Sequence, residues 1–154
     1  MALSGSFTGS TNNSTVKPKI TWSAVQNIAE NYSMVTATLT YSRTNSGYTT
    51  SGAWNGSITI NGTTTTGTAS INITYNSNTE AMSATVKVPH DTDGSKKVEI
   101  SCTGGIPVSS MKTTTCESTV ILDRIPRQAD ITSSSNFTDS DNPTVYYSNP
   151  AGSG

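Results

Sequence analysis

The segment MVTATLTYSR, residues Met34–Arg43, is the stretch of sequence that decides the fold. Apolar and polar side chains alternate along it, and the apolar positions are Val35, Ala37, Leu39 and Tyr41. Because successive side chains of a β-strand point to opposite faces of a sheet, this alternation predicts a strand with one buried face and one solvent face. The threonines on the second face also favour a strand, since a branched Cβ packs well on a pleated surface.

The same period of two recurs on both sides of this segment. Further runs lie around Leu3–Phe7, Ile20–Ala24, Ile58–Ile60, Ile71–Tyr75, Ala81–Pro89, Val98–Cys102 and Cys116–Leu122. No segment keeps the period of about 3.6 residues that marks an amphipathic helix. Asn61-Gly62 is typical of a two-residue hairpin turn. The sequence therefore predicts an all-β chain, folded as an antiparallel β-sandwich or jelly roll of about eight strands.

The composition agrees with this fold class. Of the 154 residues, 28 are Thr, 24 are Ser and 13 are Asn, while only 12% are charged. An average globular chain has about 25% charged residues. Thr favours strands, and Ser and Asn favour turns, so we expect sheets whose solvent faces are neutral and rich in hydroxyl groups.

Charge and hydropathy argue against two classes of partner. The net charge is −1 and the isoelectric point is near 5.7, so the sequence lacks the excess of Lys and Arg that is typical of a protein that binds nucleic acid or anionic membranes. No run approaches the ~18 apolar residues that a membrane-spanning helix needs. We therefore expect neither nucleic acid nor a membrane among the partners.

The sequence changes character after the stretch LDRIPR at Leu122–Arg127. Residues 128–154 contain three Asp and no Lys or Arg, and only Thr144–Tyr147 has the composition of a strand. So short a segment is too small to build its own core. We expect residues 1–124 to form the sandwich and residues 125–154 to be a hinge with an incomplete second β-module or a docking arm.

The sequence offers little for catalysis. Its single histidine, His90, stands before Asp91 in what reads as a turn, and no motif for a nucleophile, phosphate loop or zinc site is present. Glu99 and Glu117 fall on the solvent phase of their strands, where acidic residues serve solubility. We expect a protein that is not an enzyme.

Aromatic residues suggest a binding site for sugars. Tyr48 and Trp54 lie in an apparent loop or edge, and Asn55 follows directly. An exposed aromatic ring covers the apolar face of a sugar, while amide and hydroxyl groups bond its hydroxyls. This interpretation requires at least one of the two rings to be exposed in a groove. The alternative is that Trp54 is packed in the core between the sheets or lies in a protein interface.

Calcium is the one cofactor that the sequence suggests. Asp91 and Asp93 place two carboxylates two residues apart in a loop, and hard oxygen ligands at this spacing suit Ca²⁺. The alternative is that both residues serve the turn itself, because Asp bonds readily to nearby backbone amides.

The two cysteines, Cys102 and Cys116, fall on the buried phase of two adjacent expected strands. A disulfide across the strands is possible if the two residues stand opposite each other. The alternative is a pair of buried thiols that act as small apolar side chains.

Four segments of the chain resemble a known family of viral proteins. They read TWSAVQNIAENYS and VTATL within Thr21–Leu39, VPHDTDGSK at Val88–Lys96, LDRIPR at Leu122–Arg127, and a region within Asn142–Gly152. These are similar to the opening, a shared turn, the hinge and the next domain of tail-associated modular structural proteins of siphoviruses that infect Gram-positive bacteria.

This resemblance implies a virion protein built from serial β-sandwiches at the tail tip, baseplate or fibre, assembled in the bacterial cytoplasm. Its partners would be other virion proteins or copies of itself in a homo-oligomer, together with the host cell-wall polysaccharide. We therefore expect a structural module involved in host attachment. The alternative function is a carbohydrate-binding module that recognises a cell-surface glycan.

Overall fold

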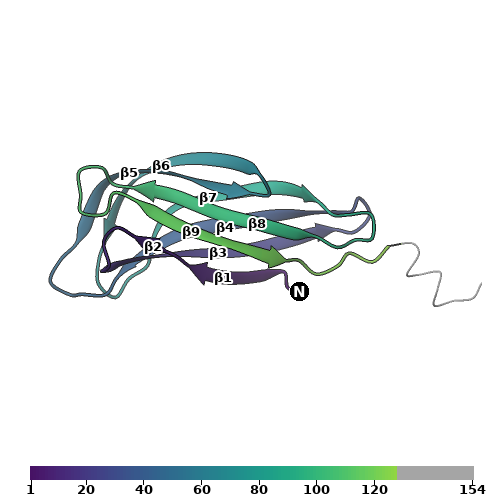
Figure 1. The fold of residues 1–154 in the computed structure, drawn as a ribbon, viewed down its shortest axis with the longest axis horizontal. Helices are drawn as coiled ribbons and strands as arrows, with labels where there is room; N and C mark the ends of the chain where they lie inside the picture. The colour runs from purple at the N-terminus through teal and green to yellow at the C-terminus, as the bar shows by residue number, and fades with distance from the viewer. Residues whose placement is uncertain (128–154) are drawn as a thin grey trace, which may run out of the picture.

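A computed structural model describes residues 1–127, and all regular secondary structure in this part of the chain is β-strand (Figure 1). The strands are β1 (Ser4–Thr8), β2 (Ser10–Thr11), β3 (Val16–Asn27), β4 (Tyr32–Arg43), β5 (Thr50–Ile60), β6 (Thr63–Ile73), β7 (Thr79–Pro89), β8 (Lys97–Gly105) and β9 (Thr114–Ile121). The expected all-β class is confirmed.

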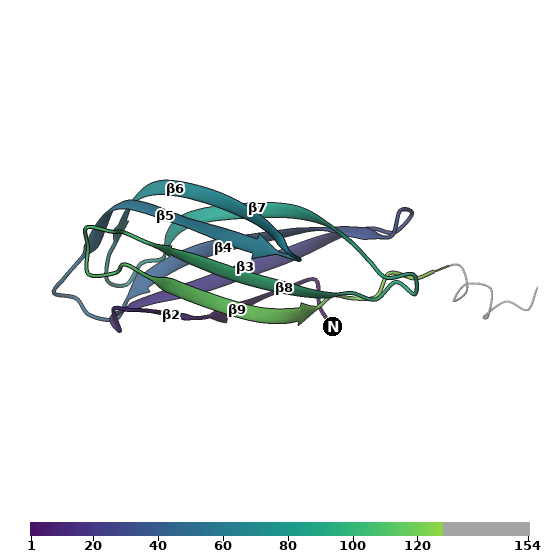
Figure 2. The ribbon, with the colours of Figure 1, turned by 45° about the horizontal axis from the view of Figure 1, so that its top comes forward.

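The strands form two antiparallel sheets that pack face to face (Figures 1 and 2). One sheet has the order β1-β3-β4-β7, and the other has the order β2-β9-β8-β5-β6. Three connections, β3–β4, β5–β6 and β8–β9, stay within one sheet, whereas the others pass from one sheet to the other. The architecture is therefore a β-sandwich, one of the two expected forms.

The core lies between the sheets and follows the alternation of the sequence. The four apolar side chains predicted to be buried in β4 all have 0% exposure, and they are Val35, Ala37, Leu39 and Tyr41. On the opposite face of the same strand, the Thr36 and Thr38 hydroxyls bond those of Thr85 and Ser83 on β7, at 2.8 and 3.0 Å. The solvent face of this sheet is thus hydroxyl-rich, as the composition indicates.

Strand β5 begins earlier than the sequence indicates. The stretch from Tyr48 to Trp54 reads as a loop or edge, but the structure is extended from Thr50 onward, and Thr50 pairs with Ile73 of β6. Small residues without a clear alternation become a strand here because the neighbouring strands supply their hydrogen bonds. The hairpin turn that follows is confirmed, with positive φ at Asn61 (51°) and Gly62 (84°).

The sandwich is followed by an extended segment, residues 122–127, that packs against it. Leu122 and Ile125 both have 0% exposure, so the packing of the sandwich extends through a residue that the sequence assigns to the hinge. The expected second module or docking arm, including the strand at Thr144–Tyr147, lies outside the described residues.

Candidate functional site

The sandwich has two poles, and the chain enters and leaves at the same one (Figure 1). We call this end the exit pole; it contains the N-terminus, the turns at 28–31, 61–62 and 90–96, and the exit segment 122–127. We call the opposite end the free pole; it consists of the loops at 12–15, 44–49, 74–78 and 106–113. Every strand spans part of the distance between them, so the two ends present separate surfaces.

The exit segment is fixed by three backbone hydrogen bonds to two parts of the exit pole, the turn at 90–96 and the N-terminus. These bonds run from Leu122 N to Lys96 O (3.0 Å), from Asp123 N to Ala2 O (3.0 Å) and from Ile125 N to Gly94 O (2.9 Å). Two side chains add to them, since Gln26 donates to Asp123 O at 2.8 Å and Arg127 donates to Ile28 O at 3.2 Å. The chain therefore leaves the sandwich in a defined direction.

Gly94 is the residue that allows this contact. Its φ of +89° is in the left-handed region, and a Cβ at this position would lie 1.9 Å from the Ile125 carbonyl oxygen. Only glycine accepts both the backbone conformation and the close approach.

The free pole is organised around one buried cation. The Arg43 side chain is only 7% exposed, and it donates to Thr50 Oγ1, to Thr15 Oγ1 at 3.1 Å, and twice to Asn45 Oδ1 at 2.9 and 3.1 Å. All of these partners are uncharged oxygens, and they come from the 12–15 loop, the 44–49 loop and the start of β5. A guanidinium with five donors can hold several segments together in this way.

Three large apolar side chains are exposed on the loops of the free pole. Tyr48 is 69% exposed, Tyr75 is 50% exposed and Val108 is 88% exposed, and each belongs to a different loop or strand end. The other five exposed large apolar side chains of residues 1–127 lie toward the exit pole, so both ends of the sandwich offer apolar contacts: they are Met1, Val25, Ile28, Met34 and Ile121.

The expected stacking pair of Tyr48 and Trp54 is not present at the surface. Trp54 has 0% exposure, and its indole Nε1 donates to Tyr41 Oη at 2.9 Å inside the core. Tyr41 Oη also lies 2.7 Å from Thr114 Oγ1, and burial raises the pKa of Tyr41 to about 12. The assignment of Trp54 as a sugar-stacking ring is therefore corrected: it is a core residue, the alternative that the sequence left open. Of the pair, only Tyr48 is accessible.

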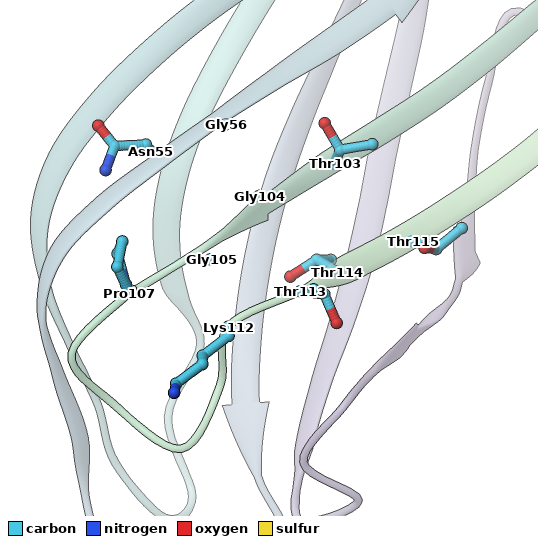
Figure 3. A pocket seen from close by; sticks show the side chains of 10 residues that line it. All are labelled: Asn55, Gly56, Thr103, Gly104, Gly105, Pro107, Lys112, Thr113, Thr114 and Thr115. Carbon is cyan, nitrogen blue, oxygen red and sulfur yellow. The ribbon is translucent and has the colours of Figure 1, made fainter.

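Asn55, the third expected sugar-binding residue, lines a groove on the outer face of the five-stranded sheet (Figure 3). The groove has a volume of about 520 Å³ and lies toward the free pole, over the middle of β5, the end of β8 and the start of β9. Its lining comprises Asn55, Gly56, Thr103, Gly104, Gly105, Pro107, Lys112, Thr113, Thr114 and Thr115. Of these, the sequence singled out Asn55 alone.

The floor of the groove is made of glycine because Trp54 lies directly beneath it. Gly56 and Gly104 face each other across β5 and β8. A Cβ on Gly56 would lie 2.4 Å from the Trp54 ring, and a Cβ on Gly104 would lie 2.5 Å from it. The sequence signal for the groove is thus the combination of a tryptophan and glycines on paired strands, which is recognisable only once the pairing is known.

The expected calcium ligands take part in the turn between β7 and β8. Asp93 Oδ1 accepts hydrogen bonds from Ser95 N at 3.0 Å and from Ser95 Oγ at 2.6 Å, and these bonds lower the pKa of Asp93. Asp91 contributes its backbone, with its carbonyl accepting from Asn31 Nδ2 at 2.9 Å. Within residues 1–127, no group of three or more metal-ligating side chains comes together. The geometry matches the turn interpretation of both residues.

His90 is buried beside this turn and has both ring nitrogens bonded. Nδ1 lies 2.7 Å from Gly94 O, and Nε2 lies 2.7 Å from Ser33 Oγ. Because a carbonyl oxygen can only accept, Nδ1 donates a hydrogen bond to Gly94 O, and in the neutral imidazole Nε2 accepts from the serine. His90 thus links β4 to the turn that holds the exit segment.

Cys102 and Cys116 are free thiols that stand directly opposite each other on β8 and β9. Both are buried, at 3% and 1% exposure. The contact with the Cys116 thiol, together with burial, raises the pKa of Cys102. The pair fills the core beneath the sheet as small apolar side chains.

No protein-family model, curated protein or solved structure matches the chain. Within residues 1–127 there is also no helix with the length and hydropathy needed to cross a membrane.

Proposed function

We propose that the chain is a structural module of a phage virion and that it takes part in attachment to the host surface through its free pole. The observation that carries this proposal is the position of the chain ends: Ala2 and Leu122 form a bridge with each other at the exit pole. The described chain thus both enters and leaves the sandwich at the exit pole, whereas the free pole consists of loops between strands.

The two poles support this division of roles. The exit segment is held by backbone bonds that fix its direction, which suits a module joined to a larger assembly. The free pole presents Tyr48, Tyr75 and Val108 on its loops, and Arg43 ties the loop that carries Tyr48 to the loop at 12–15. The virion context rests on the resemblance of four segments of the sequence to siphovirus tail-associated proteins, and many copies in one particle would raise the avidity of weak contacts.

Binding to cell walls tests the attachment part of the proposal. The full chain, biotinylated at its N-terminal amine and assembled on streptavidin, displays several free poles outward. We expect these tetramers to be retained on purified cell walls from at least one Gram-positive species, and the double variant Tyr48→Ser, Val108→Ser to reduce retention at least tenfold.

Val25→Ser is the matched control, because Val25 is 70% exposed but lies toward the exit pole on β3. Retention that depends on Val25 and not on the free-pole residues would contradict the proposal, and so would the absence of retention on every wall tested. For the virion context, antibodies against the chain should label particles released from cells that encode it; unlabelled particles would contradict a virion role.

A second candidate function is carbohydrate recognition, and the groove over Gly56 and Gly104 is the observation that favours it. The groove lies beside the free pole, so a glycan-binding role and a role in attachment are compatible.

A further inference from the structure

Four of the polar side chains around the groove are without partners in the described part of the protein. The Asn55 amide, the Lys112 ammonium and the hydroxyls of Thr113 and Thr115 form no hydrogen bond or ion pair within residues 1–127. The Lys112 and Thr113 backbone amides are already satisfied, since both donate to Asn12 Oδ1, at 2.7 and 3.1 Å. The backbone of the rim is thus fixed while its side chains remain available.

These free groups come from three separate segments and surround one hollow (Figure 3). Asn55 lies on β5, Lys112 and Thr113 on the loop before β9, and Thr115 on β9. Thr103 on β8 completes the ring, although its hydroxyl already bonds Ser57 Oγ at 3.1 Å. A ligand in the hollow would therefore meet donors and acceptors from several sides.

The chemistry of this lining defines a class of ligand. Hydroxyl and amide groups pair with the hydroxyls of a sugar, and the glycine backbone with the Pro107 ring provides an apolar surface for its C–H face. Among the described residues that line the groove, Lys112 is the one charged side chain. An ammonium without a carboxylate partner favours an anionic group on the ligand.

We infer that this groove binds a sugar ring that carries one anionic substituent, a carboxylate or a phosphate. The inference rests on the proposed function in that such a sugar would belong to a host wall polymer. Glu117, the next exposed residue of β9 after Thr115, lies outside the lining. It would weaken the attraction for an anion slightly rather than prevent it.

Trp54 provides a built-in reporter for binding, because its ring is in contact distance of the groove floor. The chain has two tryptophans, so Trp22→Phe leaves Trp54 as the single source of indole fluorescence. Four probes separate the ligand features: D-glucose, D-glucuronate, D-glucose 6-phosphate and inorganic phosphate. Amide chemical shifts of Gly104, Gly105 and Thr115 in the unsubstituted protein give a second measurement that does not depend on the Trp22 variant.

We expect D-glucuronate or D-glucose 6-phosphate to bind with a millimolar Kd, at least tenfold tighter than both D-glucose and inorganic phosphate. Which of the two anionic sugars binds tighter identifies the substituent. Lys112→Ala should remove this tenfold preference, because a hydrogen bond to a charged group is worth about one order of magnitude in affinity. Thr115→Val should weaken all sugars about threefold, and Glu117→Gln should strengthen the anionic ones about twofold.

Lys97→Ala is the matched control, because Lys97 is an exposed lysine of the same sheet at the opposite end of β8. It should leave all affinities unchanged. Equal binding of all four probes, or no shift at Gly104 and Gly105 with any of them, would overturn the inference. If the groove binds none of the probes but the protein is retained on cell walls, the inference about the groove is wrong and the proposed function stands. If the groove binds an anionic sugar but the protein is not retained on any wall, the inference stands and the proposed function is wrong.

Discussion

The two poles of the sandwich are held together in different ways. At the exit pole, backbone groups bond to backbone groups, and buried Ile125 closes the contact around Gly94. At the free pole, backbone bonds also join the loops, from Thr44 N to Thr15 O (2.9 Å) and from Asn12 N to Thr113 O (3.2 Å), and the buried Arg43 side chain adds donors to Thr15 and Asn45. The free pole therefore depends on one buried guanidinium in addition to its backbone bonds. The exit pole is therefore suited to a fixed connection, and the free pole to loops whose exposed residues vary.

The largest effect is expected when the exit contact is broken at Gly94. Gly94→Ala forces a side chain into a left-handed position and against the Ile125 carbonyl, so the free energy of unfolding should fall by about 3 kcal/mol. Gly62→Ala is the control, because its φ of +84° is similar but a Cβ there meets nothing within 4 Å. It should cost about 1 kcal/mol. Urea unfolding measures both; equal losses would show that the exit contact contributes nothing.

The next effect concerns Arg43. Arg43→Met keeps the aliphatic stem but removes the donors to Thr15, Asn45 and Thr50, and should lower the free energy of unfolding by about 2 kcal/mol. Amide hydrogen exchange in the loops at 12–15 and 44–49 should speed up by more than the global loss of stability explains. Exchange at residues 122–125 should speed up only as much as the global loss of stability predicts. Selective acceleration at the exit pole instead would contradict the division between the poles.

A smaller effect is expected from pH at the turn of the exit pole. Hydrogen bonds from Ser95 lower the folded-state pKa of Asp93 below 3.8. A carboxyl group with a lowered pKa stabilises the fold above its unfolded-state pKa, and this contribution is lost as the pH falls through the folded-state value. Asp93→Asn keeps an acceptor for Ser95 but no longer titrates. Urea unfolding at pH 7 and pH 3 measures how far the free energy of unfolding falls on acidification, and this decrease should be slightly smaller for the variant. An identical decrease in both proteins would count against the effect.

The smallest effect on stability is expected at the exposed residues of the free pole. Tyr48→Ser and Val108→Ser remove side chains that are 69% and 88% exposed, so each should change the free energy of unfolding by less than ~0.5 kcal/mol. Thermal unfolding measures this. A large loss would show that these residues support the fold, and it would remove the basis for treating them as a contact surface.

The fold was predictable where side chains alternate strongly. Strand β4 follows directly from the period of two, since burial of Val35 and Leu39 depends only on which face they occupy. The start of β5 was not predictable in this way, because Thr50–Ala53 is extended only through its pairing with β6. Local sequence does not contain information about a partner strand.

The candidate site was less predictable than the fold. Trp54 reads equally well as a surface ring or a core residue, and its burial depends on Gly56 and Gly104 from two strands. Arg43 did leave a signal, because it continues the buried phase of β4 after Tyr41. A charged residue in that phase indicates a buried polar cluster, although its partners on other loops depend on the tertiary fold.

The bridge between Ala2 and Leu122 has a consequence for protein engineering. Because the chain enters and leaves at the same pole, residues 2–127, which keep the contact of Ile125 with Gly94, have the geometry of a cassette for a surface loop of another protein. Such a graft would hold the sandwich at two points and point its far loops away from the carrier. Those loops could then be randomised as a display library while the backbone-bonded end preserves the attachment.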